Sequence, residues 1–215
     1  MSPPRLFSLF LIVLSGCMLA SLPAHTDELE PSSGAYLGLS GAFGISLFGG
    51  QFESSSLENP KLGNSAGFQV KAGYRVASWL ALEAQYEWLD EFVLTARSDV
   101  PDETKKVAQF KPQTVTANLK FILPTGRIEP HVIVGLGVGL WEITRIQKRT
   151  SVQKSFFAAR LGAGVDFYLT RSWVLNVQGT GVIGTTKFDQ NDLGLVFEID
   201  NLNYFSLSAG VSYCF

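Results

Sequence analysis

Residues 204–215 read Tyr204-Phe205-Ser206-Leu207-Ser208-Ala209-Gly210-Val211-Ser212-Tyr213-Cys214-Phe215, an unbroken alternation of apolar residues with small or polar ones. Successive side chains of a β-strand point to opposite faces, so this period of two predicts a strand with one bulky apolar face. A water-soluble barrel would bury that face, whereas a membrane barrel would turn it toward lipid. One strand alone leaves both interpretations open.

The composition narrows the class of protein. The chain has 215 residues, of which 17% are charged and 12% aromatic, and its formal net charge is -2. That length predicts one domain, and the charge provides no basic field for nucleic acid, so we expect no nucleic-acid partner. Beyond the first residues, no apolar run approaches the roughly 20 residues that a membrane helix needs. An apolar composition without long apolar runs favours β-strands in which every second side chain faces lipid.

The first residues predict an export signal. Arg5 precedes an apolar run over residues 6–14, and a cut after Ala24 would follow small residues. We therefore expect a signal peptide over 1–24, a short periplasmic lead-in over 25–33 and the folded domain over 34–215. In a second reading, Leu14-Ser15-Gly16-Cys17 resembles the lipobox of bacterial lipoproteins, with Cys17 as the lipidated first residue. The ordinary cut is favoured because the apolar stretch continues past Cys17, and either cut leaves Cys214 without a disulfide partner.

Period-two alternation recurs in eight segments. Each segment pairs a bulky apolar face with a face of small, polar or charged residues. The predicted strands cover residues 34–45, 66–76, 80–88, 114–123, 128–143, 155–169, 173–183 and 204–215. Their connections alternate long and short, and the long ones include predicted loops over 46–64, 90–112 and 184–201.

Two strands carry a family resemblance. Tyr213 and Phe215 resemble the end of the terminal strand of bacterial outer-membrane barrels, and residues 34–45 resemble the opening strand of OmpA-like membrane domains. Over about residues 34–215, the chain resembles the small OmpA-like or porin-type outer-membrane β-barrel domain. The resemblance implies an all-β, eight-stranded antiparallel up-and-down transmembrane β-barrel in the bacterial outer membrane, with short periplasmic turns and long extracellular loops.

The resemblance also implies partners. They are the outer-membrane lipids, periplasmic chaperones, and the outer-membrane assembly machinery, which would read Tyr213 and Phe215. Aromatic residues near strand ends predict an interfacial girdle. These residues are Trp79, Trp88, Trp141, Tyr168, Trp173 and Tyr213.

The lumen is predicted from strand register. If the turn over 77–79 places Val76 near Leu80, then Gly73 faces Glu83, Lys71 faces Gln85 and Gln69 faces Glu87, with Lys71 and Arg75 diagonal to Glu83. Charges enclosed in a narrow barrel need partners. We therefore expect a lumen charge cluster that plugs the barrel, made of Lys71, Arg75, Glu83, Glu87, Lys120 and Arg160. The alternative is a wet lumen in which these charges are hydrated.

The predicted barrel fold does not by itself determine the function of the protein. Eight strands enclose little more than their own side chains, which favours a structural or surface-interaction protein that acts through its loops, with at most a narrow channel and a host or surface ligand as a further partner. The alternatives are a small porin-like channel, a carrier of apolar solutes, or a lipid A-modifying enzyme.

The sequence has few candidates for catalytic or cofactor-binding residues. Lipid A-modifying barrels use a His with Ser or Asp near the outer leaflet, but His25 lies at the leader junction and His131 at the predicted periplasmic end, where we expect a wall residue hydrogen-bonded near Glu129. Gly135-x-Gly137-x-Gly139 continues a strand and opens no helix, so it favours a glycine-lined wall over a dinucleotide site. We expect no enzymatic activity, no cofactor and no metal site.

Overall fold

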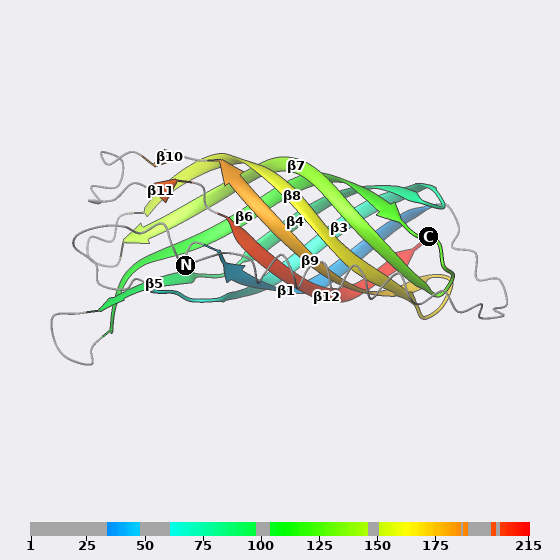
Figure 1. Ribbon diagram of the computed structural model, residues 1–215, viewed down its shortest axis with the longest axis horizontal. Coiled ribbons are helices and arrows are strands. Elements are labelled where there is room, and N and C mark those ends of the chain that lie inside the picture. Colours follow the sequence, from blue (N-terminus) through cyan, green and yellow to red (C-terminus); the bar gives the residue numbers. More distant parts are fainter. Residues whose placement is uncertain are drawn as a thin grey trace, which may run out of the picture.

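A computed structural model describes residues 34–47, 61–97, 104–145, 151–185, 187–188, 199–200 and 203–215 (Figure 1). The predicted signal peptide, its cleavage site and the lead-in over 25–33 lie outside these residues, as do parts of the long loops. Among the described residues, no helix is long and apolar enough to cross a membrane.

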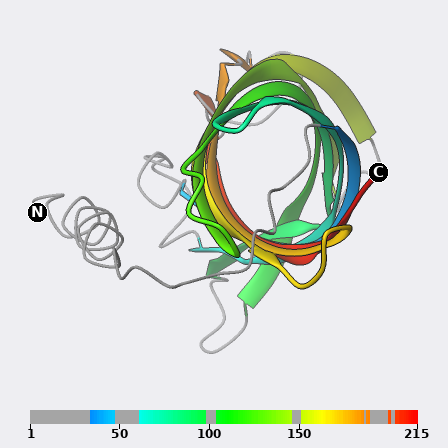
Figure 2. The ribbon, with the colours of Figure 1, turned by 90° about the vertical axis from the view of Figure 1, so that its right-hand side faces the viewer.

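Eight antiparallel strands close into a barrel, which confirms the predicted fold. Each strand pairs with its neighbours along the chain, and the first pairs with the last, so the ring has no open edge (Figure 2). The strands are β1 (Ala35–Ser46), β3 (Ser65–Ala77), β4 (Leu80–Leu89), β6 (Thr104–Ile122), β7 (Ile128–Arg145), β8 (Ser151–Tyr168), β9 (Trp173–Thr185) and β12 (Tyr204–Cys214).

Alternation along each strand separates the two faces. Large apolar side chains point outward, as with Leu39, Val138 and Leu161, whereas the residues between them are buried and mostly polar or small. A soluble barrel would show the opposite arrangement. Closure pairs the backbone groups that would otherwise be unsatisfied in hydrocarbon.

The loop predicted over 90–112 is wrong. This segment contains β5 (Phe92–Arg97) and the first part of β6. The two strands pair with each other, from Phe92 opposite Phe110 to Arg97 opposite Thr104. A short β2 (Lys61–Leu62) adds to β5 within the predicted loop over 46–64. Charged residues obscured the alternation in this hairpin.

Pro112 shows how β6 continues through a residue that cannot donate a hydrogen bond. On one side β6 pairs with β4 only as far as Gln113 and with β5 only from Phe110. Pro112 therefore falls in the gap between two partner strands, where no ladder bond from its nitrogen is required.

The predicted loop over 184–201 also contains strands. β9 continues to Thr185, and β10 (Lys187–Phe188) pairs with β11 (Ile199–Asp200). The apolar run Leu195-Val196-Phe197 predicts an early extension of the terminal strand, and it lies outside the described residues.

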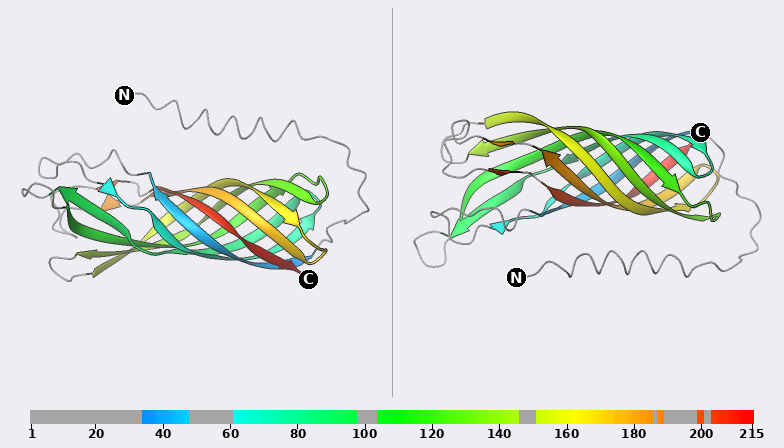
Figure 3. Two further views of the ribbon diagram at one scale, coloured as in Figure 1. Left: turned by 90° about the horizontal axis from the view of Figure 1, so that it is seen from below. Right: turned by 45° about the horizontal axis from the view of Figure 1, so that its top comes forward.

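The barrel has two unlike ends. The short-turn end carries the turns over 78–79, 123–127 and 169–172, and the other end, which we call the long-loop end, carries the longer connections. Gly126 has φ of 97°, a conformation that favours glycine in the tight turn between β6 and β7. At the long-loop end, β6, β7 and β8 reach beyond β1 and β12 (Figures 1 and 3).

The predicted register of β3 and β4 is confirmed opposite Glu83, Gln85 and Glu87. It shifts between Arg75 and Ala77, because Ala77 pairs with Leu80 and leaves Val76 as the extra residue of a bulge. Val76 therefore does not pair with Leu80, and its side chain points outward.

Candidate functional site

The lumen is the candidate site because it gathers the buried charges. Among the residues whose burial is described, four cations and four anions are buried, so the interior is formally neutral with histidine uncharged. The cations are Lys71, Arg75, Lys120 and Arg160, and the anions are Glu83, Glu87, Glu129 and Asp166. All six residues of the predicted cluster are therefore inside the barrel.

The first group of contacts, the Arg75 layer, lies at the short-turn end. Arg75 donates from both terminal nitrogens to Glu129, at 2.8 Å and 2.9 Å, and also donates to the Tyr168 hydroxyl at 2.9 Å. A two-pronged arginine–carboxylate pair fixes orientation as well as charge. The expected pairing of Arg75 with Glu83 is wrong, because the chain curves around the lumen and places β7 within reach of this side chain.

The second group, the Asp166 layer, lies next to the Arg75 layer, because Asp166 faces Glu129 in the β7–β8 pair. The Lys120 ammonium donates to Asp166 at 2.5 Å and sits 5.7 Å from the centre of the Tyr36 ring. Tyr36 donates its hydroxyl hydrogen to Glu83 at 2.9 Å. Its ring lies against Gly73, where any side chain would collide with it, so this inward glycine makes room for the ring.

Lys71 does not form the expected ion pair with Glu83. Among the described residues, the ion pairs inside the lumen join Arg75 to Glu129, Lys120 to Asp166 and Arg160 to Glu87. The stem of Lys71 instead packs over Gly38, close to Ser212.

His131 lies on the inner wall as predicted, but its neighbour is different. Its Nδ1 is 3.7 Å from an Asp166 carboxylate oxygen, and neither ring nitrogen has a hydrogen bond among the described residues. The expected hydrogen bonding near Glu129 is wrong, because the carboxylate beside His131 is that of Asp166 and Glu129 is engaged by Arg75.

The third group, the Glu87 layer, lies toward the long-loop end. Glu87 accepts from Arg160 at 3.2 Å, Tyr204 at 2.7 Å, Ser206 at 3.1 Å and Gln69 at 3.2 Å. Arg160 also donates to Thr114 at 2.9 Å. Arg160 donates to Thr180 as well, at 3.3 Å, so side chains from six strands converge on one ion pair.

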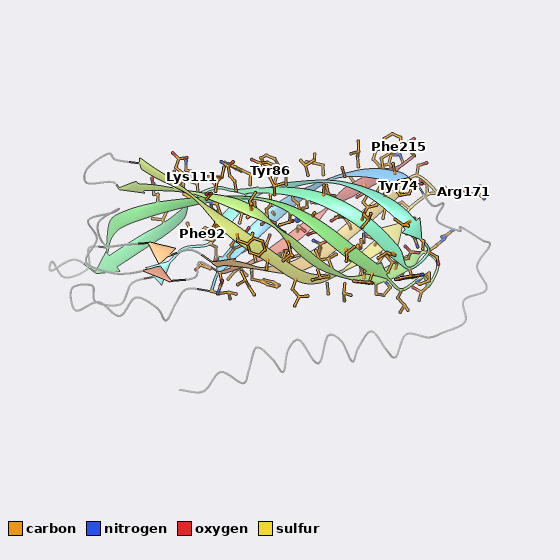
Figure 4. All side chains as sticks on the ribbon, turned by 90° about the horizontal axis from the view of Figure 1, so that it is seen from above. Tyr74, Tyr86, Phe92, Lys111, Arg171 and Phe215 are labelled. Atoms are coloured by element: carbon orange, nitrogen blue, oxygen red, sulfur yellow. The ribbon has the colours of Figure 1, made fainter. Side chains whose placement is uncertain are left out.

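Apolar side chains cover the Glu87 layer on its long-loop side. Leu89, Phe92 and Phe156 are buried, and the Phe92 and Tyr204 ring centres are 6.3 Å apart (Figure 4). Phe156 lies over Gly139, so the glycine-lined wall predicted for β7 gives room to an aromatic ring. These rings form an apolar cap over the ion pairs.

Four lumen residues have partners that the sequence pattern did not predict. The predicted cluster did not include Glu129, Asp166, Tyr36 or Tyr204. Each of the four lies in the inward phase of its strand. That phase was the available signal, but the partner across the lumen depends on closure of the barrel.

The lumen leaves little space for a solute. At the short-turn mouth, a cavity of about 30 Å³ is lined by residues including Arg75, Asp166 and Cys214. A cavity of that volume has room for about two water molecules. Within the described part of the chain, no group of three or more His, Cys, Asp or Glu residues could hold a metal ion.

Aromatic residues gather on the outer surface at the short-turn end. Trp173 packs edge-on against Tyr213, and Tyr213 packs edge-on against Phe215, each pair with centres 5.2 Å apart. Trp79 stacks with Phe121. Tyr168, predicted in the girdle, instead turns its hydroxyl toward Arg75. The side chain of Trp141 lies outside the described part.

An apolar outer surface around a neutral, side-chain-filled interior defines the class of closed, membrane-spanning β-barrels. Residues 11–215 match the outer membrane protein beta-barrel domain, and the chain belongs to that family of the bacterial outer membrane. No curated protein matches the sequence.

Solved structures share the fold. Neisserial surface protein A is 18% identical with a TM-score of 0.57, covering 85% of this chain and 98% of its own. The outer membrane protein AlkL is 18% identical with a TM-score of 0.53, covering 91% of this chain and 95% of its own. OprG from Pseudomonas aeruginosa is 13% identical with a TM-score of 0.50, covering 88% and 99%.

Proposed function

We propose that this protein is a closed surface barrel with a structural or surface-interaction role, exerted through its long-loop end. The observation that carries the proposal is the lumen, in which three ion-pair layers and an apolar cap follow one another along the barrel. A porin-like channel needs a continuous aqueous path, and a carrier of apolar solutes needs an apolar one. The ion pairs interrupt an apolar path and the apolar cap interrupts an aqueous one, so the lumen favours neither a channel nor a carrier.

The long-loop end supports the interaction role. There β5, β6, β7 and β8 continue the barrel wall as a paired sheet beyond the ends of β1 and β12 (Figure 3). A paired sheet holds the connecting loops on a firm base, which suits contacts with a host or surface ligand. In the outer membrane, we place this end outside the cell and the short-turn end in the periplasm, in line with the usual loop asymmetry of such barrels.

We expect no enzymatic activity. His131 is buried in the lumen beside Asp166, in the short-turn half, and it is therefore remote from the outer leaflet in this orientation.

Conductance across a planar lipid bilayer tests the closed lumen. The unmodified protein should conduct weakly or intermittently. Arg75→Ala with Glu129→Ala removes both members of a layer, leaves neither charge stranded, and should increase the conductance. Arg171→Ala, at an exposed turn residue beside the same mouth, is the control and should change it little. A large, steady conductance in the unmodified protein would contradict the proposal.

A further inference from the structure

A groove lies on the outer surface of the barrel in its short-turn half, lined by residues of β6, β7, β8, β9 and β12. Its volume is about 640 Å³. Its floor is formed by Ala163 and Gly179, which face each other in the β8–β9 pair. Its walls are made of large apolar side chains, including Phe121, Val132, Phe167, Val177 and Leu207.

The groove follows from residue size and register. Neighbouring residues on the same face of a strand are about 7 Å apart, so Ala163 leaves a dip between Leu161 and Val165. Gly179 pairs with Ala163 and continues the dip onto the next strand, where the side chains of Phe205 and Leu207 border it. The lining of the groove is almost wholly apolar, which suits the hydrocarbon chain of a lipid.

The surroundings identify what covers the groove. The protein lies in the outer membrane, and this face is apolar, so lipid is in contact with it. Arg127, in the exposed turn between β6 and β7, accepts through its carbonyl oxygen from the Tyr168 nitrogen at 2.8 Å, next to Phe167 of the groove wall. The three short turns contain Arg127 and Arg171 and no acidic residue. Exposed guanidinium groups favour phosphate at this end of the barrel.

We propose that the groove binds one acyl chain of a phospholipid whose phosphate pairs with Arg127. The bound lipid fills a depression that the side chains leave open, and its head group adds an ion pair at the membrane surface. It is held more firmly than the surrounding lipids. This site is independent of the proposed function, because it lies outside the lumen and away from the long loops.

Native mass spectrometry of the barrel, extracted from bacterial membranes in mild detergent, tests the site. The unmodified protein should retain one phospholipid. Ala163→Leu fills the floor and should reduce the lipid-bound fraction by about tenfold or more, a change of roughly 1.4 kcal/mol or more in binding free energy. Ala159→Leu makes the same change on the same outward face of β8, four residues away, and should retain the lipid. Gly179→Leu is a second groove variant, and heat-modifiable gel migration verifies that each variant is folded.

The contribution of the head group is tested by adding lipids back. After delipidation, phosphatidylglycerol should bind better than uncharged diacylglycerol, and Arg127→Gln should abolish the difference. The proposal is overturned if the unmodified protein retains no lipid, or if the variants at 159 and 163 retain it equally. A dimer that Ala163→Leu dissociates would assign the groove to a second copy of the chain instead.

Discussion

At the scale of single residues, Glu87 is the most highly connected anion of the lumen. Four donors from other strands reach its two oxygens. Such a carboxylate neutralises Arg160 and joins distant parts of the wall. Removing it would leave a buried guanidinium without its charge partner, which is costly in an interior that excludes water.

We therefore predict that Glu87→Ala lowers the free energy of unfolding by about 3–5 kcal/mol. Glu87→Leu combined with Arg160→Met should recover much of the loss, because it replaces the pair with apolar groups of similar volume. Urea unfolding in lipid vesicles measures both effects. Ser208→Ala, which loses one weak contact on the same inner wall, is the control and should cost about 1 kcal/mol or less. If the double variant is less stable than Glu87→Ala, the ion pair is not the source of the stability.

At the scale of elements, alternation made the eight barrel strands predictable from the sequence. Each strand faces lipid on one side and the lumen on the other, so burial imposes a period of two along its whole length. The same logic predicted the pairing of β3 with β4, because a short turn fixes the register of neighbouring strands.

The sequence did not predict what depends on closure or on packing outside the main barrel strands. Arg75 meets Glu129 across the lumen, and their separation along the chain gives no sign of that contact. Phe92 lies in a charged segment, and only the approach of Gly44 and Tyr204 makes it a buried residue of the cap. Patterns along a strand report which face a residue occupies, whereas curvature of the sheet decides its partner.

The terminal strand carries a prediction of its own. Phe215 is 69% exposed and contacts Tyr213 through its ring edge, so it contributes little to the lumen and remains available to an assembly partner. Phe215→Ser should strongly reduce outer-membrane assembly, measured by heat-modifiable migration of the membrane fraction. Leu169→Ser is a matched control, because Leu169 is 64% exposed at the same end. Equal assembly of the two variants would refute a recognition role for Phe215.

At the scale of the whole molecule, the two ends of the barrel suit different surroundings. The short-turn end has three compact turns, an aromatic belt and the cavity beside Cys214. The long-loop end has a wall raised by β5 to β8 and an apolar cap beneath it. A protein built for contacts outside the cell should present the long-loop end there, and the orientation in the membrane can be measured directly.

Single cysteines introduced into a Cys214→Ser background test that orientation. Asp102→Cys lies in the connection between β5 and β6, and Ser78→Cys lies in the exposed turn between β3 and β4. A membrane-impermeant maleimide added to intact cells should label the cysteine at 102, since that connection belongs to the long-loop end. It should label the cysteine at 78 only after the outer membrane is permeabilised. Substitution at Ser78 keeps the backbone carbonyl that Arg75 contacts, so the reporter should not disturb the lumen. Labelling of position 78 but not 102 on intact cells would place the short turns outside and remove the basis for a surface-interaction role through the long loops.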